Sequence, residues 1–234
     1  MTGGDNPFSA ALGLLIGFDP ALMAIIALSL QVSVIAVLIA ALLGLPLGAI
    51  IALFRFPGRG LVVTVLNALM GLPPVVVGLM VYLLLSRAGP LGPLGLLFTP
   101  TAMIIAQCVL VTPIIAALAR QVVEDLWHEY EEQLRSLGSG RIRAIPTLLW
   151  DARISLLTTV LAGFGRASAE VGAVLIVGGN IEGVTRVMTT AIALETSKGD
   201  LPLALGLGIV LLLMIAVVNG AAFLIGESAR RRLG

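Results

Sequence analysis

Long apolar stretches separated by short polar segments dominate the chain. The first stretch of spanning length runs from Ala21 to Phe54 and is interrupted only by Ser29, Gln31 and Ser33. It exceeds the roughly 20 residues that one bilayer needs, and no turn cluster divides it, so it predicts one long helix that is tilted or projects from the membrane. Further apolar stretches follow at Leu61 to Leu85, Thr101 to Ala119, Ile154 to Val177 and Leu201 to Gly226. The pattern predicts an all-α, polytopic membrane bundle of about five transmembrane helices.

Prolines mark where these predicted helices bend. Pro73 and Pro74 lie near the middle of the second stretch. They remove backbone donors and force a break or kink there, which is either a packing kink or the hinge of a gate. The shorter apolar run from Phe8 to Phe18 is below spanning length and predicts an interfacial segment.

The pattern changes abruptly after the third stretch. Arg120 to Arg153 holds 11 of the 27 charged residues in the chain, together with both tryptophans and the only histidine. It predicts an acidic helix that ends at Gly138, followed by a short basic helix from Gly140 to Ala144. The charge pattern leaves two interpretations open: a compact unit that docks into a groove on a soluble partner, or a solvated hairpin that only joins two spans.

Composition agrees with a membrane location. The chain has 234 residues, of which 59% are hydrophobic and 12% charged, and its mean hydropathy is +1.10. Soluble domains carry about 25% charged residues, so lipid must cover part of this apolar surface. We expect one membrane domain at 21–226, an extracytoplasmic or interfacial segment at 1–20 and a basic tail at 227–234. The net charge of +1 gives no reason to expect a nucleic-acid partner.

The basic residues predict the orientation of the chain. One side collects Arg55, Arg59, Arg120, Arg135, Arg141, Arg143, Arg153, Arg230, Arg231 and Arg232. The opposite side has only Arg87, Arg186 and Lys198. Because cytoplasmic loops are enriched in Lys and Arg, we expect the segment 120–153 in the cytoplasm, the N-terminus outside and the C-terminus inside.

Two segments resemble one family of transporters. Glu132 to Gly138 resembles the EAA loop of binding-protein-dependent type I ABC importer permeases, with Gln133 and Leu134 in place of two alanines. The later Ile-x-Leu-Pro of that loop falls on Leu148 to Asp151, where the proline is missing. Phe164 to Ile181 is similar to a segment of the molybdate, sulfate and tungstate permeases. Thr189 to Asp200 resembles the tungstate branch.

The resemblance implies a function and partners. It implies import of an oxyanion, most like tungstate, with molybdate or sulfate as alternatives, across the inner (plasma) membrane. In this family the permease is a homodimer with two ATP-binding-cassette ATPase subunits and an extracytoplasmic oxyanion-binding protein. This chain would bind no cofactor, because the ATPase uses ATP and Mg²⁺. The cytoplasmic loop would be the coupling helix, with the candidate residues Glu131, Glu132, Arg135, Gly138, Arg141 and Arg143.

Polar residues within the fourth predicted span suggest a translocation path. Arg166 and Glu170 are spaced i, i+4 in an apolar helix, so they share a face. Either they form a pair that only fixes helix packing, or they line the pore, where Arg166 attracts an oxyanion and Glu170 keeps that attraction weak. The candidate path and gate residues are Pro73, Pro74, Arg166, Glu170, Gly172, Gly178, Gly179, Asn180, Thr189 and Thr190.

The Gly178-Gly179-Asn180 segment also has two interpretations. It is an ordinary turn before a helix N-terminus, or its backbone amides and those beside Thr185, Thr189 and Thr190 donate hydrogen bonds to a tetrahedral dianion.

Other classes of membrane protein fit the sequence less well. An ion-coupled secondary carrier usually has more spans and an internal repeat with paired broken helices. An intramembrane enzyme needs a catalytic cluster, and His128 has no second ligand at metal spacing. No P-loop is present, so any ATP hydrolysis requires a separate subunit.

Overall fold

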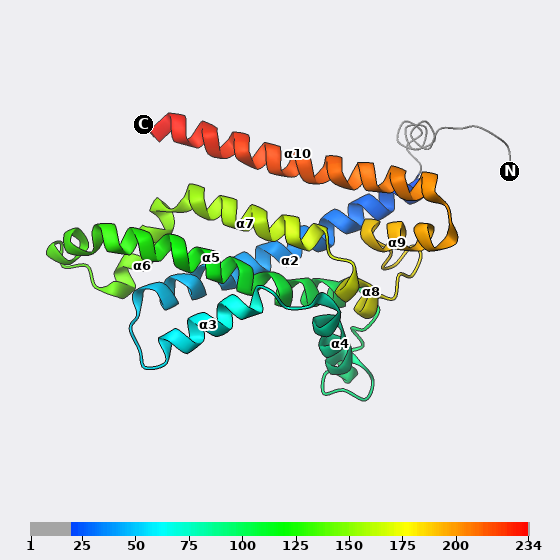
Figure 1. The fold of residues 1–234 in the computed structure, drawn as a ribbon, viewed down its shortest axis with the longest axis horizontal. Helices are drawn as coiled ribbons and strands as arrows, with labels where there is room; N and C mark the ends of the chain where they lie inside the picture. The colour runs from blue at the N-terminus through cyan, green and yellow to red at the C-terminus, as the bar shows by residue number, and fades with distance from the viewer. Residues whose placement is uncertain (1–19, 234) are drawn as a thin grey trace. The chain divides into compact units, whose positions relative to one another are not determined.

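The computed structural model describes residues 20–233, and every regular element in that range is a helix (Figure 1). The predicted all-α class is confirmed. The interfacial segment predicted at 8–18 lies outside the described residues. The helices are α2 (Pro20–Leu53), α3 (Arg59–Leu69), α4 (Pro74–Leu85), the 3₁₀ turn η1 (Gly92–Leu94), α5 (Pro100–Ser136), α6 (Arg141–Asp151), α7 (Arg153–Ser168), α8 (Gly172–Gly178), α9 (Met188–Lys198) and α10 (Leu201–Leu233).

Among the described residues, three helices are long and apolar enough to cross a membrane: Leu22–Leu53, Pro100–Ser136 and Leu201–Leu224. Two bent pairs, α3 with α4 and α6 with α7, each pass the same test as a broken span, which gives up to five. The single long helix predicted from Ala21 is confirmed, with Pro46 inside it. The break predicted at Pro73 and Pro74 is confirmed as well, because α3 ends at Leu69 and α4 begins at Pro74.

The predicted fourth span, Ile154 to Val177, is not one helix. Helix α7 ends at Ser168 and α8 begins only at Gly172, so three residues between them are not helical. The prediction of a continuous helix is therefore wrong.

The chain divides into two compact units. The first contains residues 20–35, Pro74–Gln107 and Ser168–Gly220, and the second contains Ala36–Pro73, Cys108–Ala167 and residues 221–233. Helices α2, α5 and α10 each contribute residues to both units. The two units are described separately below.

In the second unit, small residues let helices approach closely. A Cβ added at Gly48 of α2 would lie 2.5 Å from the carbonyl oxygen of Ala116 in α5. At Gly163 of α7 it would lie 2.9 Å from a methyl carbon of Val111. Small residues at such crossings let membrane helices pack backbone to backbone. A cluster at the end of α2 joins α5 and α6 through Ala49, Ala52, Leu53, Val123, Trp127, Ala144 and Leu148.

In the first unit, α4 packs against α8 in the same manner. A Cβ added at Gly78 would lie 2.7 Å from the Cα of Ala173. Leu22 of α2, Ala191 of α9 and Leu207 of α10 form a second buried cluster. These contacts hold α8 and α9, which carry four of the ten predicted translocation residues, Gly172, Gly178, Thr189 and Thr190.

The apolar surface of the long helices is that of a membrane protein. Leu42 of α2 is 74% exposed and Phe223 of α10 is 67% exposed. In water these side chains would cost free energy at about 25 cal/mol per Å² of apolar surface, whereas lipid removes that cost. These exposed apolar side chains agree with the sequence-based prediction that lipid covers part of the apolar surface.

Candidate functional site

The polar end of α5 and the start of α6 form the first candidate site. The charged segment is not a separate helix, because α5 continues without a break from Pro100 to Ser136. It ends in a Schellman turn: the N–H of Ser139 donates to the carbonyl of Leu134, and the N–H of Gly138 donates to that of Arg135, both at 2.9 Å. Gly138 has φ +73°. The prediction that Gly138 ends the helix is confirmed.

The second helix of this loop is longer than predicted. The expected basic helix from Gly140 to Ala144 is in fact α6, which runs from Arg141 to Asp151. Its first residues are basic, and Ala144 and Leu148 pack under Trp127 of α5. Burial of these side chains stabilises the helix beyond Ala144, because one face of the helix is apolar over several turns.

The predicted coupling residues surround this turn. Arg135 pairs with Glu131 one turn earlier, with Nη2 and Oε1 2.7 Å apart. Glu132 is exposed on α5. Within the described part of the chain, Arg141 and Arg143 have no hydrogen-bond or ion-pair partner.

Exposed apolar side chains flank the same turn, and the sequence-based prediction did not include them. Leu137 is 82% exposed and Ile142 is 72% exposed. Beside them, an open hollow is lined by Phe54, Gly138, Gly140, Arg141, Ile142 and Arg143. An apolar residue on each side of a Gly-Ser-Gly turn in a charged segment is the signal that would have identified this surface. We call the surface formed by Leu137, Gly138, Ile142 and Arg143 the loop surface.

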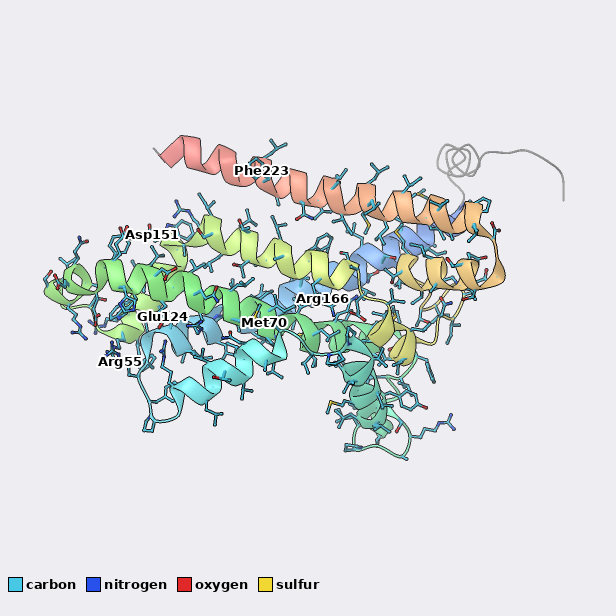
Figure 2. All side chains as sticks on the ribbon, viewed as in Figure 1. Arg55, Met70, Glu124, Asp151, Arg166 and Phe223 are labelled. Carbon is cyan, nitrogen blue, oxygen red and sulfur yellow. The ribbon has the colours of Figure 1, made fainter. Side chains whose placement is uncertain are left out.

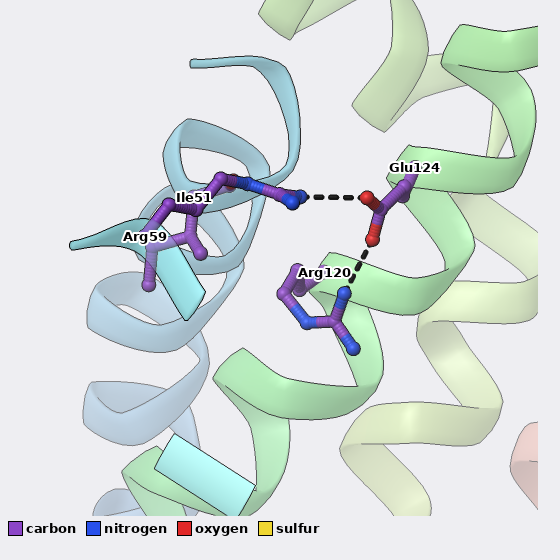
Figure 3. Close-up of polar contacts among 4 residues, drawn as sticks. All are labelled: Ile51, Arg59, Arg120 and Glu124. Atoms are coloured by element: carbon purple, nitrogen blue, oxygen red, sulfur yellow. Dashed lines mark hydrogen bonds and ion pairs between the residues drawn. The ribbon is translucent and has the colours of Figure 1, made fainter. Parts of the chain in front are cut away.

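An ion-pair network links three helices near the loop (Figure 3). Arg59 Nη2 lies 2.6 Å from Glu124 Oε1, and Arg59 Nε donates to the carbonyl of Ile51 at 2.9 Å. Arg120 also pairs with Glu124, through the other carboxylate oxygen. These contacts join the end of α2 and the start of α3 to α5. Sequence reasoning used both arginines only for orientation and missed the network.

The second candidate site lies in the first unit, in the segment that follows α7 along the chain and leads into α9. Glu170 is only 3% exposed and lies in the break between α7 and α8. Its Oε1 accepts a hydrogen bond from the N–H of Ala173 at 3.0 Å, and its carbonyl accepts one from the Thr189 hydroxyl at 2.8 Å. Glu170 therefore caps α8 and anchors α9.

Arg166 lies in the last turn of α7 (Figure 2). The premise that Arg166 and Glu170 share a face of one helix is wrong, because the helix ends at Ser168. A role of either residue in the translocation path stays a prediction.

The predicted glycine loop is a tight turn with internal hydrogen bonds. Gly179 has φ +72° and Asn180 φ +51°. The Thr185 hydroxyl donates to the carbonyl of Gly178 at 2.6 Å and accepts from the N–H of Ile181 at 2.9 Å. These contacts account for the buried position of Thr185 without a ligand. A contact between this loop and an oxyanion stays a prediction.

The backbone N–H groups at the start of α9 also donate hydrogen bonds to side chains. The Thr190 hydroxyl accepts from the N–H of Val187 at 3.1 Å, and the Ser29 hydroxyl of α2 accepts from the N–H of Met188 at 2.8 Å. Gly172 and Gly178 are sites of close packing, against Val75 and Met103. Most of the predicted path residues therefore lie on one folded segment, whose side chains hold it together.

No group of three or more His, Cys, Asp or Glu side chains in the described range is arranged to hold a metal ion. His128 is exposed on α5.

Comparison with known proteins tests the resemblance. Residues 44–233 match the family model described as the inner membrane component of binding-protein-dependent transport systems. The tungstate uptake system permease protein of Peptoclostridium acidaminophilum is 44% identical over 220 residues, which cover 94% of this chain and 96% of the relative. A probable anion ABC transporter permease of Haloferax volcanii is 41% identical, over 86% of this chain and 90% of the relative. The molybdenum transport system permease of Escherichia coli is 31% identical, over 78% and 83%.

These relatives are permease subunits of transporters rather than enzymes, as the sequence predicted. The family model covers most of the chain and includes both candidate sites. The chain therefore belongs to the family of inner membrane components of binding-protein-dependent ABC transport systems.

Proposed function

We propose that this chain is the permease subunit of an ATP-driven importer for tungstate. The observation that carries the proposal is its 44% identity, over nearly the full length of both chains, to a tungstate uptake permease. The tungstate uptake permease of Campylobacter jejuni is 37% identical over 91% of this chain. A molybdenum permease and a sulfate permease share 31% and 30%, which makes molybdate and sulfate the alternative cargoes.

The partners follow from the family and from the absence of a P-loop in the sequence. Two ATPase subunits would hydrolyse ATP with Mg²⁺, and an extracytoplasmic binding protein would deliver the oxyanion. This chain would bind no cofactor. Two copies would form the pore along a two-fold axis, each copy contacting one ATPase.

The loop surface is the proposed contact with the ATPase. Leu137 and Ile142 offer apolar area on an otherwise charged loop, and the Arg143 side chain offers a charge that has no partner among residues 20–233. An apolar patch with a charged rim is typical of an interface core and its rim. Glu131, Glu132, Arg135 and Arg141 lie around it, on α5 and α6.

The same surface would be cytoplasmic. The arginines near the end of α2 and along the segment 120–153 outnumber those on the opposite side, as basic residues do in cytoplasmic loops. The N-terminus would then lie outside and the C-terminus inside.

The translocation path would include the folded segment around Glu170. Arg166 would attract the oxyanion, and the Glu170 carboxylate would weaken that attraction enough for release. The Gly172, Gly178, Gly179 and Asn180 backbone, with Thr189 and Thr190, would shape the path. The break at Pro73 and Pro74 would serve as the hinge of a gate.

Reconstitution tests the cargo. The permease, its ATPase and the binding protein are placed in proteoliposomes, and ATP-dependent uptake of radiolabelled tungstate is measured with and without competing molybdate or sulfate. We expect uptake that an excess of either competitor reduces only weakly. Uptake of molybdate or sulfate in preference to tungstate would reassign the cargo, and ATP-independent uptake would contradict the importer itself.

The same assay separates the charge of Glu170 from its capping role. Glu170→Gln keeps an acceptor oxygen for the N–H of Ala173 but removes the negative charge, so we expect a folded protein with reduced turnover. Glu170→Ala removes both and should also lower thermal stability by roughly 1 kcal/mol. Full transport by Glu170→Gln would leave Glu170 with a packing role only.

A further inference from the structure

A second hollow lies in the second unit, where the end of α2 meets α5 and α6. Its volume is about 60 Å³, and its lining includes Arg55, Arg59, Glu124, Trp127, His128 and Arg141. One water needs roughly 10–15 Å³ of such space. The hollow therefore has room for a small polyatomic group rather than for a single water or a nucleotide.

The charges of the lining favour an anion. Three guanidinium groups face one carboxylate, that of Glu124. This carboxylate is already paired, with Arg59 at 2.6 Å and with Arg120. Within the described residues, Arg55 and Arg141 have no hydrogen-bond or ion-pair partner. Two guanidinium groups thus remain for a ligand with several acceptor oxygens, the arrangement that suits a phosphate group.

The position of the hollow indicates where such a ligand comes from. The apolar stretch of α2 ends at Leu53, and Arg55 follows two residues later. Phe56 is exposed in the same turn, and Trp127 lines the hollow from α5. Aromatic and basic residues at the end of a span mark the level of lipid headgroups. Basic pockets between helices at this level bind the phosphates of anionic lipids.

We propose that this hollow binds a phosphate group, supplied by an anionic phospholipid headgroup or by a free oxyanion from solution. Its place at the end of a span favours the lipid. The phosphate would bridge Arg55, after α2, to Arg141, at the start of α6. Because Arg141 directly follows the turn at Gly138, the bound group would steady the base of the loop surface. The proposal does not depend on which oxyanion is transported.

Trp127 provides a reporter inside the hollow. The chain has two tryptophans, so Trp150→Phe leaves Trp127 as the only one. This variant is reconstituted in vesicles of phosphatidylcholine with a minority of phosphatidylglycerol, and bromine quenchers are placed on the acyl chains of one lipid or the other. We expect brominated phosphatidylglycerol to quench Trp127 more than the same fraction of brominated phosphatidylcholine.

Variants that lack the arginine charges test whether the quenching depends on this hollow. In the same background, Arg55→Gln with Arg141→Gln should abolish the excess quenching, since each arginine near an anionic headgroup contributes roughly fivefold in affinity. Neither side chain has a partner to lose in the part of the chain that the structure describes, and circular dichroism checks that the variant is folded. Arg143→Gln removes the same charge from α6 but does not line this hollow, so it should keep the excess quenching.

A second arm distinguishes the free anion. The protein in pure phosphatidylcholine is titrated with inorganic phosphate in a calorimeter. Heat of binding that the double variant loses, without excess lipid quenching, assigns the site to a soluble oxyanion. The proposal is overturned if neither signal exceeds that of the double variant, or if Arg143→Gln loses as much signal. It is also overturned if the double variant keeps its lipid but no longer binds the ATPase, because the arginines would then contact protein.

Discussion

At the scale of single residues, the backbone of Gly138 determines where α5 stops. Its φ of +73° lies in the left-handed region, yet a Cβ there would meet nothing within 4 Å. Glycine is therefore required here because of the backbone conformation, and not because a side chain would collide with a neighbour. The two hydrogen bonds of the Schellman turn depend on that conformation.

Gly138→Ala should cost about 1 kcal/mol in the turn, the usual cost of a left-handed conformation for a residue with a side chain. We expect roughly fivefold weaker binding of the ATPase subunit in a pull-down assay and a matching loss of transport-coupled ATP hydrolysis. Gly140→Ala is the matched control, because Gly140 has φ −75° and also faces open space. Unchanged assembly and coupling in Gly138→Ala would contradict the assignment of this turn.

Two residues show the limits of prediction at this scale. Gly138 was predictable because a helix stop is encoded locally, in the glycine itself. The helix break at Glu170 was not, because its neighbours Ala169 and Val171 are apolar and the sequence pattern indicates one continuous helix. Its carbonyl is held by Thr189, 19 positions later, and no local pattern contains that contact.

At the scale of helices, the Glu124 carboxylate is the shared partner of two arginines. Arg59 and Glu124 are 65 positions apart, and the network fastens the start of α3 to α5. The side chains of Arg59 and Glu124 retain 27% and 25% exposure. The contribution of this ion pair to the free energy of unfolding should thus lie between that of an exposed pair and that of a buried pair.

Glu124→Gln should lower the free energy of unfolding by roughly 1–2 kcal/mol, because both guanidinium groups lose their counter-charge while partly buried. Thermal unfolding in detergent measures the change. Asp125→Asn removes the same charge from an adjacent, exposed position and should leave the midpoint unchanged. Equal shifts of the unfolding midpoint in the two variants would show that the network affects stability only through the overall charge of the protein.

Helix existence was largely predictable from apolar length and prolines, whereas helix boundaries set by tertiary contacts were not. The prediction divided α5 into a span and a separate loop helix, since its composition changes at Arg120. The structure keeps one helix, because backbone hydrogen bonding continues through a change of solvent as long as no residue interrupts it. For α6, burial of Ala144 and Leu148 extended a helix that the sequence predicted only from Gly140 to Ala144.

At the scale of the whole molecule, orientation is the main proposal that remains to be tested. The single cysteine makes the test direct. In a Cys108→Ser background, a cysteine is introduced by Ser139→Cys, in the loop turn, or by Ala88→Cys, in the exposed loop after α4. We expect a membrane-impermeant maleimide to label the first only from the cytoplasmic side and the second only from outside. The reverse pattern would invert the topology and remove the loop surface from the ATPase.

Helix α5 continues without a break to Ser136, and this limits where residues can be inserted or deleted. An insertion of one residue between Trp127 and Leu134 would turn everything beyond it by about 100° and move it about 1.5 Å along the axis. The faces that carry Trp127 and Leu134 would then point in different directions. Insertions and deletions should be tolerated at residues 137–140, outside the helix, and rejected within it. A scan of single-residue insertions along 121–140, scored by ATP-dependent uptake in the reconstituted system proposed above, would map that boundary.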